Sequence, residues 1–365
     1  MKRTVWMVIV VMLLFGCSGC SSTELESRNF PMVITVDAGN ESFEVAMGFQ
    51  NLAEIADEKA EDEGTEPIGI EQKNWQSAFS EGDEEHPKTM DYNHVKALIL
   101  SQEILENDRL LGEFLEYMER QEVFARNTLL FTSDENAADL LKLEGNLELS
   151  LGMYLEEMMT NQNEMKSRAV VTLGNLLNEY RNQMENVYIP VLKEQDGRPK
   201  IIEYYVLCGG KGAGTIDRES YKLAMLLEGK LNQYKIENGV TSKLIHYGDA
   251  AILLDRISTN YTYEKTEDGV LAKTVVTAEA RLQNGRIATS EEQKQLKKEI
   301  EKQLLRQTDT LVKLNLWEKQ LDLTNSYYRL GGYRRELYEI YQSDRTAYAN
   351  DLTLDISYNI TPVLE

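Results

Sequence analysis

An unbroken apolar run over residues 5–15, "VWMVIVVMLLF", sets the first limit on how this chain folds. Lys2 and Arg3 precede it, as in the charged start of a secretory signal. The run is too short to cross a bilayer as a helix, which needs about 20 apolar residues. It therefore predicts export, with residues 1–16 as a signal peptide. Hydrophobic residues make up 42% of the chain and charged residues 27%, so we expect the remainder to fold in water.

The sequence directly after this run, Leu14-Phe15-Gly16-Cys17, looks like a bacterial lipobox. A leucine three positions before the cysteine and a small residue one position before it place the thiol for diacylglyceryl transfer. Phe15 departs from the small or branched residue usual between them. Cys20 is the alternative site, with Gly19 before it but Cys17 in the place of the leucine. We predict lipid attachment at Cys17, with residues 17–29 as anchor and tether to a membrane surface.

The C-x-x-C spacing of Cys17 and Cys20 also fits a redox pair or half of a metal site. Both uses need a folded framework, whereas the flanks here are the apolar run and the soft segment "SSTELESRN". The chain has no second cysteine pair that would complete a zinc site. We therefore predict no metal and no cofactor. The third cysteine, Cys208, is expected to be a small buried residue.

The formal net charge is −22, and removal of Lys2 and Arg3 with the signal peptide makes it more negative. Such a chain is repelled by nucleic-acid phosphates and by anionic lipid headgroups. Nucleic-acid binding is not expected.

The first half of the mature chain alternates strand and helix signals. Residues 30–49 read as two strands joined at Asp37-Ala38-Gly39-Asn40, a hairpin signal. Residues 54–87 read as an acidic loop interrupted by the short segment "IGIEQKNWQSAF". A strand at 94–101, a helix at 102–121, a strand at 127–133 and a helix capped by Ser133 and Asp134 predict a parallel strand pair with a crossover. Residues 147–185 are expected to be helical.

Pro190, Gly197 and Pro199 fall close together where this helical pattern stops, and we expect a domain boundary there. The predicted domains are 30–190, a middle domain 191–260 and a C-terminal α+β domain 261–365. In the last of these, residues 276–282 alternate as a half-buried strand. Ser290 and Gln293 form a capping-box signal for a long helix.

Apolar positions mark one side of this long helix and one face of the final strand. They are Leu296, Ile300, Leu304 and Leu311 in the helix, and Leu352, Leu354, Ile356, Tyr358 and Ile360 in the strand. The predicted fold class is multi-domain α+β, with mixed sheets, packed helices and a long C-terminal helix against an antiparallel sheet.

Motifs for catalysis are missing from the sequence. In "GGKGAGT", residues 209–215, Lys211 is followed by Gly212 rather than by the Ser or Thr of a P-loop, so a strand-to-helix turn is expected. The three histidines, His86, His94 and His246, form no zinc motif, and no nucleophile motif is present. We predict no catalytic residue and no enzyme activity, which also disfavours a lipid-anchored hydrolase.

With these elements in place, the chain resembles the Ger(x)C family, the lipoprotein C subunits of spore germinant receptors. The resemblance lies in "ELESRNFPMVITVD" ending at Asp37, in His94-Val95-Lys96 before a strand, and in Arg126-Asn127 before the next. The charged helical segment 291–317 and the alternating last strand are also similar to the family.

The resemblance implies a non-enzymatic subunit of three α+β domains on the outer face of the spore inner membrane. It also implies that the subunit works with multi-span A and transporter-like B membrane subunits to pass on a nutrient signal. The alternative is a solute-binding lipoprotein of a transporter, which requires a cleft between two similar lobes.

Overall fold

The computed structural model describes residues 28–39, 42–49, 68–72, 75, 77, 79, 88–121, 124–161, 170–183, 185–236, 251–283, 287, 289–342 and 344–363. The predicted signal peptide, both candidate lipid-attachment cysteines, most of the acidic loop, His86 and His246 lie outside these residues. None of the helices within the described part of the chain combines the length and apolar character needed to span a membrane.

Residues up to Asp217 build an eight-stranded mixed sheet with the order β10-β9-β8-β7-β6-β2-β3-β4. The four central strands β2, β6, β7 and β8 run parallel to one another, and all pairs outside them are antiparallel. The strands are β2 (Pro31–Ala38), β3 (Phe43–Phe49), β4 (Ile68–Gln72), β6 (Ala97–Ser101), β7 (Leu129–Ser133), β8 (Asn186–Gln195), β9 (Arg198–Cys208) and β10 (Lys211–Asp217). The predicted hairpin and the parallel crossover pair are confirmed as β2–β3 and β6–β7.

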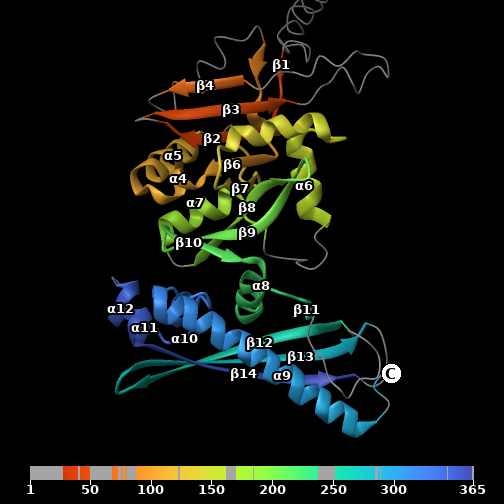
Figure 1. Cartoon of the computed structure of the whole chain (residues 1–365). Helices are drawn as coiled ribbons and strands as arrows, with labels where there is room; N and C mark the ends of the chain where they lie inside the picture. Colours follow the sequence, from red (N-terminus) through yellow and green to blue (C-terminus); the bar gives the residue numbers. More distant parts are fainter. Residues whose placement is uncertain are drawn as a thin grey trace, which may run out of the picture.

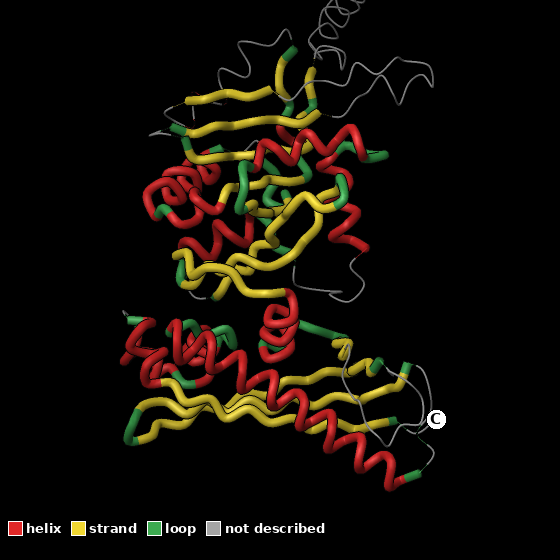
Figure 2. Tube along the Cα trace, viewed as in Figure 1, coloured by secondary structure: helices red, strands yellow, loops and turns green. Residues whose placement is uncertain are grey.

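Helices cover both faces of this sheet (Figure 2). On one face, α4 (Gln102–Glu106), α5 (Asp108–Arg120) and α7 (Leu173–Asn182) share a core with Ile34, Val36 and Leu98. On the other face, the 3-10 helix η3 (Ala137–Asn146) and α6 (Leu151–Asn161) pack on Val33, Ala97 and Ile99. Alternate side chains of β2 and β6 therefore point to opposite faces of the sheet and are buried in two different cores. A small parallel pair, β1 (Arg28–Asn29) with β5 (Thr89–Met90), and the 3-10 turn η2 (Tyr92–His94) lie beside them.

The helix expected after Ser133 and Asp134 starts later and has a different cap. It is η3, a 3-10 helix that begins at Ala137, with Asn136 as its N-cap. The Asp37 carboxylate, at the end of β2, accepts hydrogen bonds from the backbone N–H groups of Ala137 (2.7 Å) and Ala138 (3.1 Å). The Asn136 side chain also accepts from the N–H of Ala138 (2.9 Å), so the helix start has a local cap as well as one supplied from 100 residues away. The distant contribution leaves no trace in the local sequence.

Residues after Asp217 form a second sheet with the order β11-β12-β13-β14, which lies below the first in Figure 1. Its strands are β11 (Tyr234–Ile236), β12 (Ile252–Thr266), β13 (Gly269–Leu282) and β14 (Leu352–Pro362). The first three are antiparallel as expected, but β14 pairs with β13 in parallel. The parallel pairing is possible because a long helical connection, rather than a short turn, joins β13 to β14.

That connection begins with the long helix α9 (Ser290–Val312), which crosses one face of the second sheet (Figure 1). The predicted apolar side is confirmed, since Leu296, Ile300, Leu304 and Leu311 are buried in a core shared with the sheet. The capping box lies one residue earlier than predicted, with Thr289 as N-cap and Glu292 at its third helical position. The π-helical segment Lys313–Trp317 and the short helices α10 (Ser326–Tyr333), α11 (Arg335–Tyr341) and α12 (Arg345–Asp351) complete the connection.

The expected boundary between residues 190 and 191 falls inside β8, and the one between 260 and 261 falls inside β12. The turn residues that suggested the first boundary close a hairpin instead. Gln195 pairs with Arg198, and Asp196 and Gly197 between them have φ values of 58° and 73°. Two residues with positive φ form the tight turn that matches the twist of paired strands. The first sheet therefore continues as far as Asp217.

The two sheets are joined by α8 (Arg218–Leu227), which lies between them in Figure 1. Its buried residues share one hydrophobic core with Tyr188 and Tyr204 of the first sheet. The same core contains Val276 of the second sheet and Ile300 of α9, which belong to the second part of the molecule, the residues after α8. The rings of Tyr204 and Tyr221 stack with centroids 3.5 Å apart. The connection between the two parts is thus a packed core rather than a linker.

Candidate functional site at the junction of the two sheets

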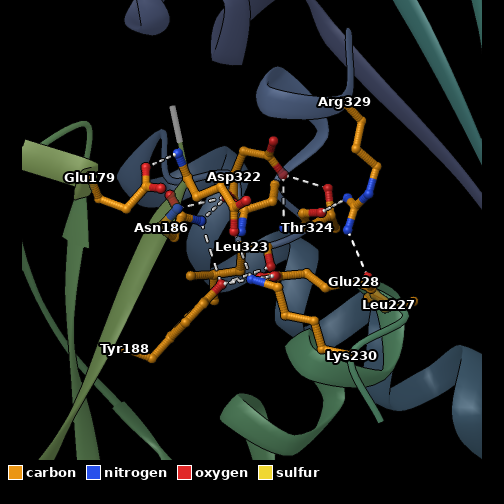
Figure 3. A network of polar contacts seen from close by, with 12 residues as sticks. Glu179, Asn186, Tyr188, Leu227, Glu228, Lys230, Asp322, Leu323, Thr324 and Arg329 are labelled. Atoms are coloured by element: carbon orange, nitrogen blue, oxygen red, sulfur yellow. Dashed lines mark hydrogen bonds and ion pairs between the residues drawn. The ribbon is translucent and has the colours of Figure 1, made fainter. Parts of the chain in front are cut away.

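A polar network lies beside this shared core, where four distant segments of the chain meet (Figure 3). They are the end of α7, the start of β8, the residues after α8, and the segment 321–325 that leads into α10. The buried side chains of Asn186, Tyr188, Glu228, Asp322 and Asn325 form its centre. Because buried polar groups need partners, this network indicates a built feature of the fold.

The start of β8 is bonded directly to the segment before α10. The backbone N–H of Asn186 donates to Oδ1 of Asn325 (2.7 Å), and Nδ2 of Asn186 donates to the carbonyl oxygen of Asp322 (2.7 Å). The Tyr188 hydroxyl lies 2.8 Å from Oε1 of Glu228 and 3.0 Å from the carbonyl oxygen of Leu323, and its single proton can be donated to either acceptor. These bonds fix the first sheet against the second part of the molecule.

Glu228 is a fully buried carboxylate, with a side chain that is 0% exposed. Its Oε2 lies 2.7 Å from Nζ of Lys230, which is also 2.9 Å from Oε2 of Glu185. Burial by itself lowers the pKa of Lys230, but the carboxylates of Glu228 and Glu185 outweigh burial and raise it. Burial, followed by the charge of Glu228, raises the pKa of Tyr188 well above its ordinary value. Lys230 is therefore charged and Tyr188 is neutral, so the buried carboxylate has both a cation and a donor.

Arg329 of α10 closes the network on the other side. Its guanidinium donates to the carbonyl oxygens of Thr324 and of Glu228, the latter at 2.9 Å. It also lies 4.0 Å from the ring centroid of Tyr261, within the range of a cation–π contact.

The Asp322 carboxylate caps the start of α10. It accepts bonds from the N–H groups of Thr324 (2.9 Å) and Ser326 (2.8 Å) and from the Ser326 hydroxyl (2.6 Å). An anion at a helix N-terminus is favourable, because the first N–H groups of a helix lack partners within it. This cap holds the segment before α10 in the shape that the network requires.

A cavity of about 670 Å³ opens beside the network. Both parts of the molecule contribute polar side chains to its wall, including those of Asn175, Glu179, Lys230, Asn325 and Arg329. Among the described residues, no group of three or more His, Cys, Asp or Glu side chains is arranged to hold a metal ion. The residues described around the cavity are suited to hydrogen bonding and ion pairing.

The residues singled out in the sequence lie elsewhere. Cys17 and Cys20 are outside the described residues, so their role as lipid-attachment sites stays a prediction. Cys208 is partly buried, and burial raises the pKa of its thiol, which disfavours a reactive thiolate. The strand-to-helix turn expected for residues 209–215 is wrong: Gly209 and Gly210, with φ values of 60° and 78°, form the two-residue hairpin turn between β9 and β10. His94 packs edge-on against the ring of Phe30.

Comparison with known proteins agrees with this architecture. Residues 21–194 match the family model described as the spore germination protein N-terminal domain. The fold is similar to the crystal structure of the GerBC protein, with a TM-score of 0.58 and 14% sequence identity. That similarity covers 90% of this chain and 96% of the GerBC chain. No curated protein matches the sequence.

Residues 21–194 therefore form a domain of the spore germination protein family. Together with the GerBC-like fold along nearly the whole chain, this domain agrees with the expected resemblance to the Ger(x)C family. The predicted α+β class with mixed sheets is confirmed.

Proposed function

We propose that this protein is the C subunit of a spore germinant receptor, needed for nutrient-triggered germination. The match of residues 21–194 to the spore germination domain is the observation that carries the proposal. In this role the protein works without catalysis, in complex with membrane-embedded A and B subunits. It is held by a lipid at Cys17, or alternatively at Cys20, on the outer face of the spore inner membrane.

The matched domain begins at residue 21, directly after both candidate cysteines. A lipid at either cysteine would thus precede the domain and leave its fold untouched. The non-enzymatic role is supported by the ion pairs of Lys230 with Glu185 and Glu228, which favour a structural use of these three charges over a catalytic one.

The alternative function, a solute-binding lipoprotein of a transporter, calls for two similar lobes. Here the first part is an eight-stranded sheet with helices on both faces, and the second is a four-stranded sheet. This difference favours the receptor subunit.

The anchor is tested by mass spectrometry of the N-terminal peptide, together with membrane fractionation of Cys17→Ala, Cys20→Ala and the double variant. We expect a diacylated Cys17, release of the Cys17→Ala protein from membranes, and retention of Cys20→Ala. A lipid on Cys20 would select the alternative site. Full retention of the double variant, with no lipid on its peptide, would contradict lipid anchoring.

The partners are tested by purifying the tagged protein from detergent-solubilised spore membranes. We expect two membrane proteins to accompany it, one multi-span and one transporter-like. Recovery of the protein alone, or with the permease of a solute transporter, would contradict the receptor role.

A further inference from the structure

We propose that the cavity at the junction of the two sheets binds a small amine that also carries hydroxyl groups, of about the size of an amino sugar. This site goes beyond the receptor role proposed above. It does not depend on which membrane subunits the protein joins.

A buried hydrogen-bond donor without a partner, in a residue that lines the cavity, is the first observation. Asn325 lines the cavity and is only 1% exposed. Its Oδ1 accepts the bond from the backbone N–H of Asn186, which fixes the orientation of the amide. Nδ2 then has no hydrogen-bond partner among the described residues. A buried donor without an acceptor is costly, so an oxygen atom of a ligand would be bound there favourably.

The charge of the cavity wall is the second observation. Three carboxylates, those of Glu179, Glu185 and Glu228, face two cations, Lys230 and Arg329. Lys230 is held by Glu185 and Glu228, and Arg329 donates to backbone carbonyl oxygens. Both cations are therefore already engaged by the protein.

Glu179 is the carboxylate of this wall that has no cation as a direct partner. Its oxygens accept from the backbone N–H of Glu185 (2.8 Å) and from Nδ2 of Asn178 (3.3 Å). No ion pair between described residues includes Glu179. An ammonium group in the cavity would supply the missing cation, whereas an anionic ligand would be repelled.

The size and shape of the cavity fit a small molecule. Its volume of about 670 Å³ lies within the range of small-molecule sites. Tyr221 and Met225 add an apolar part to the wall. Glu179 belongs to the first part of the molecule and Asn325 to the second, so a ligand that contacts both would link them.

Three probes of equal size separate the possible ligand chemistries: glucosamine, neutral glucose and anionic glucuronate. Binding is measured by calorimetry on residues 21–365, which contain every described residue. We expect glucosamine to bind about tenfold more tightly than glucose, and glucuronate to bind most weakly, since one added ion pair of about 1.4 kcal/mol gives that ratio. Glucuronate as the tightest ligand, or no binding of glucosamine at millimolar concentration, would overturn the proposal.

Two variants place the binding in this cavity. Glu179→Gln should remove the preference for glucosamine over glucose, while the exposed Glu299→Gln should keep it. Asn325→Gly keeps the positive φ of 55° but loses the amide, and should weaken binding of both sugars about tenfold. Asp196→Gly, also at positive φ but in the β8–β9 turn, is its control.

Should Asn325→Gly fail to fold, Glu179→Gln still decides the question. Its unchanged preference for glucosamine would place the amine outside this cavity. If the tests in spores contradict the receptor role, these binding results still stand. The two proposals are therefore tested separately.

Discussion

At the carboxyl end of β2, Asp37 keeps a carboxylate almost out of water, with 5% of the residue exposed. Burial raises the pKa of this carboxyl above its ordinary value, against the lowering effect of the Ala137 and Ala138 N–H groups. The Glu44 and Asp139 charges raise it further. The folded protein therefore binds the Asp37 proton more tightly than the unfolded chain does.

This pKa predicts how the stability of Asp37→Asn changes with pH relative to wild type. Because the folded pKa is raised, wild type gains stability from this group as pH falls from neutral through the folded pKa towards about 4. The variant lacks that gain. Urea unfolding of both proteins between these pH values should show that the free energy of unfolding of wild type rises relative to that of the variant as the pH is lowered. The opposite slope would contradict a raised pKa.

We predict that burial of the Glu228 carboxylate is tolerated only because Lys230 supplies its cation. Lys230→Met leaves that charge without its cation, and we expect a loss of about 3 kcal/mol in the free energy of unfolding. The exposed Lys302→Met is the matched control and should change it by less than about 0.5 kcal/mol. Adding Glu228→Gln to Lys230→Met should restore part of the loss. Equal effects of Lys230→Met and Lys302→Met in chemical denaturation would refute the role of the pair.

At the scale of elements, the start of α9 gives a direct test of its capping register. The Thr289 hydroxyl accepts from the N–H of Glu292, whose carboxylate accepts from the N–H of Thr289. Thr289→Ala should therefore cost about 1 kcal/mol in the free energy of unfolding. Ser290→Ala, at the position that the sequence suggested, should cost much less. A larger loss at Ser290 than at Thr289 in thermal unfolding would show that the helix starts one residue later.

Local patterns predicted the elements better than their ends and partners. The alternation in residues 276–282 and the spacing of Leu296, Ile300 and Leu304 gave the right strand and helix, because burial of one face imposes those periods. The contribution of Asp37 to the cap of η3 could not be predicted, since it comes from another strand. The residues Pro190 and Gly197 fit a domain boundary as well as they fit a strand and its hairpin turn, because a tight turn and a linker use the same residue types.

For the molecule as a whole, the core around α8 predicts cooperative unfolding. Tyr204 of the first sheet, Tyr221 of α8 and Val276 of the second sheet are buried in one cluster, so neither part keeps its core intact alone. Calorimetry of residues 21–365 should give a single transition whose calorimetric and van't Hoff enthalpies agree. Two separate transitions would contradict the shared core.

The junction network could not be predicted from the sequence, although the family could. Asn186, Glu228 and Asp322 are far apart along the chain, and each is ordinary in its local context. Only the packing of α8 and the segment before α10 against β8 brings them together. The short matches around Asp37 and His94 belong instead to the first sheet, where the family match also lies.

Nutrient-triggered germination of spores is the measurement that tests the receptor role most directly. Spores that lack this protein should lose optical density far more slowly in nutrient than wild-type spores do. The wild-type gene should restore the response, and the Cys17→Ala, Cys20→Ala double variant should not. Deletion spores that germinate at the wild-type rate in every nutrient would contradict the account.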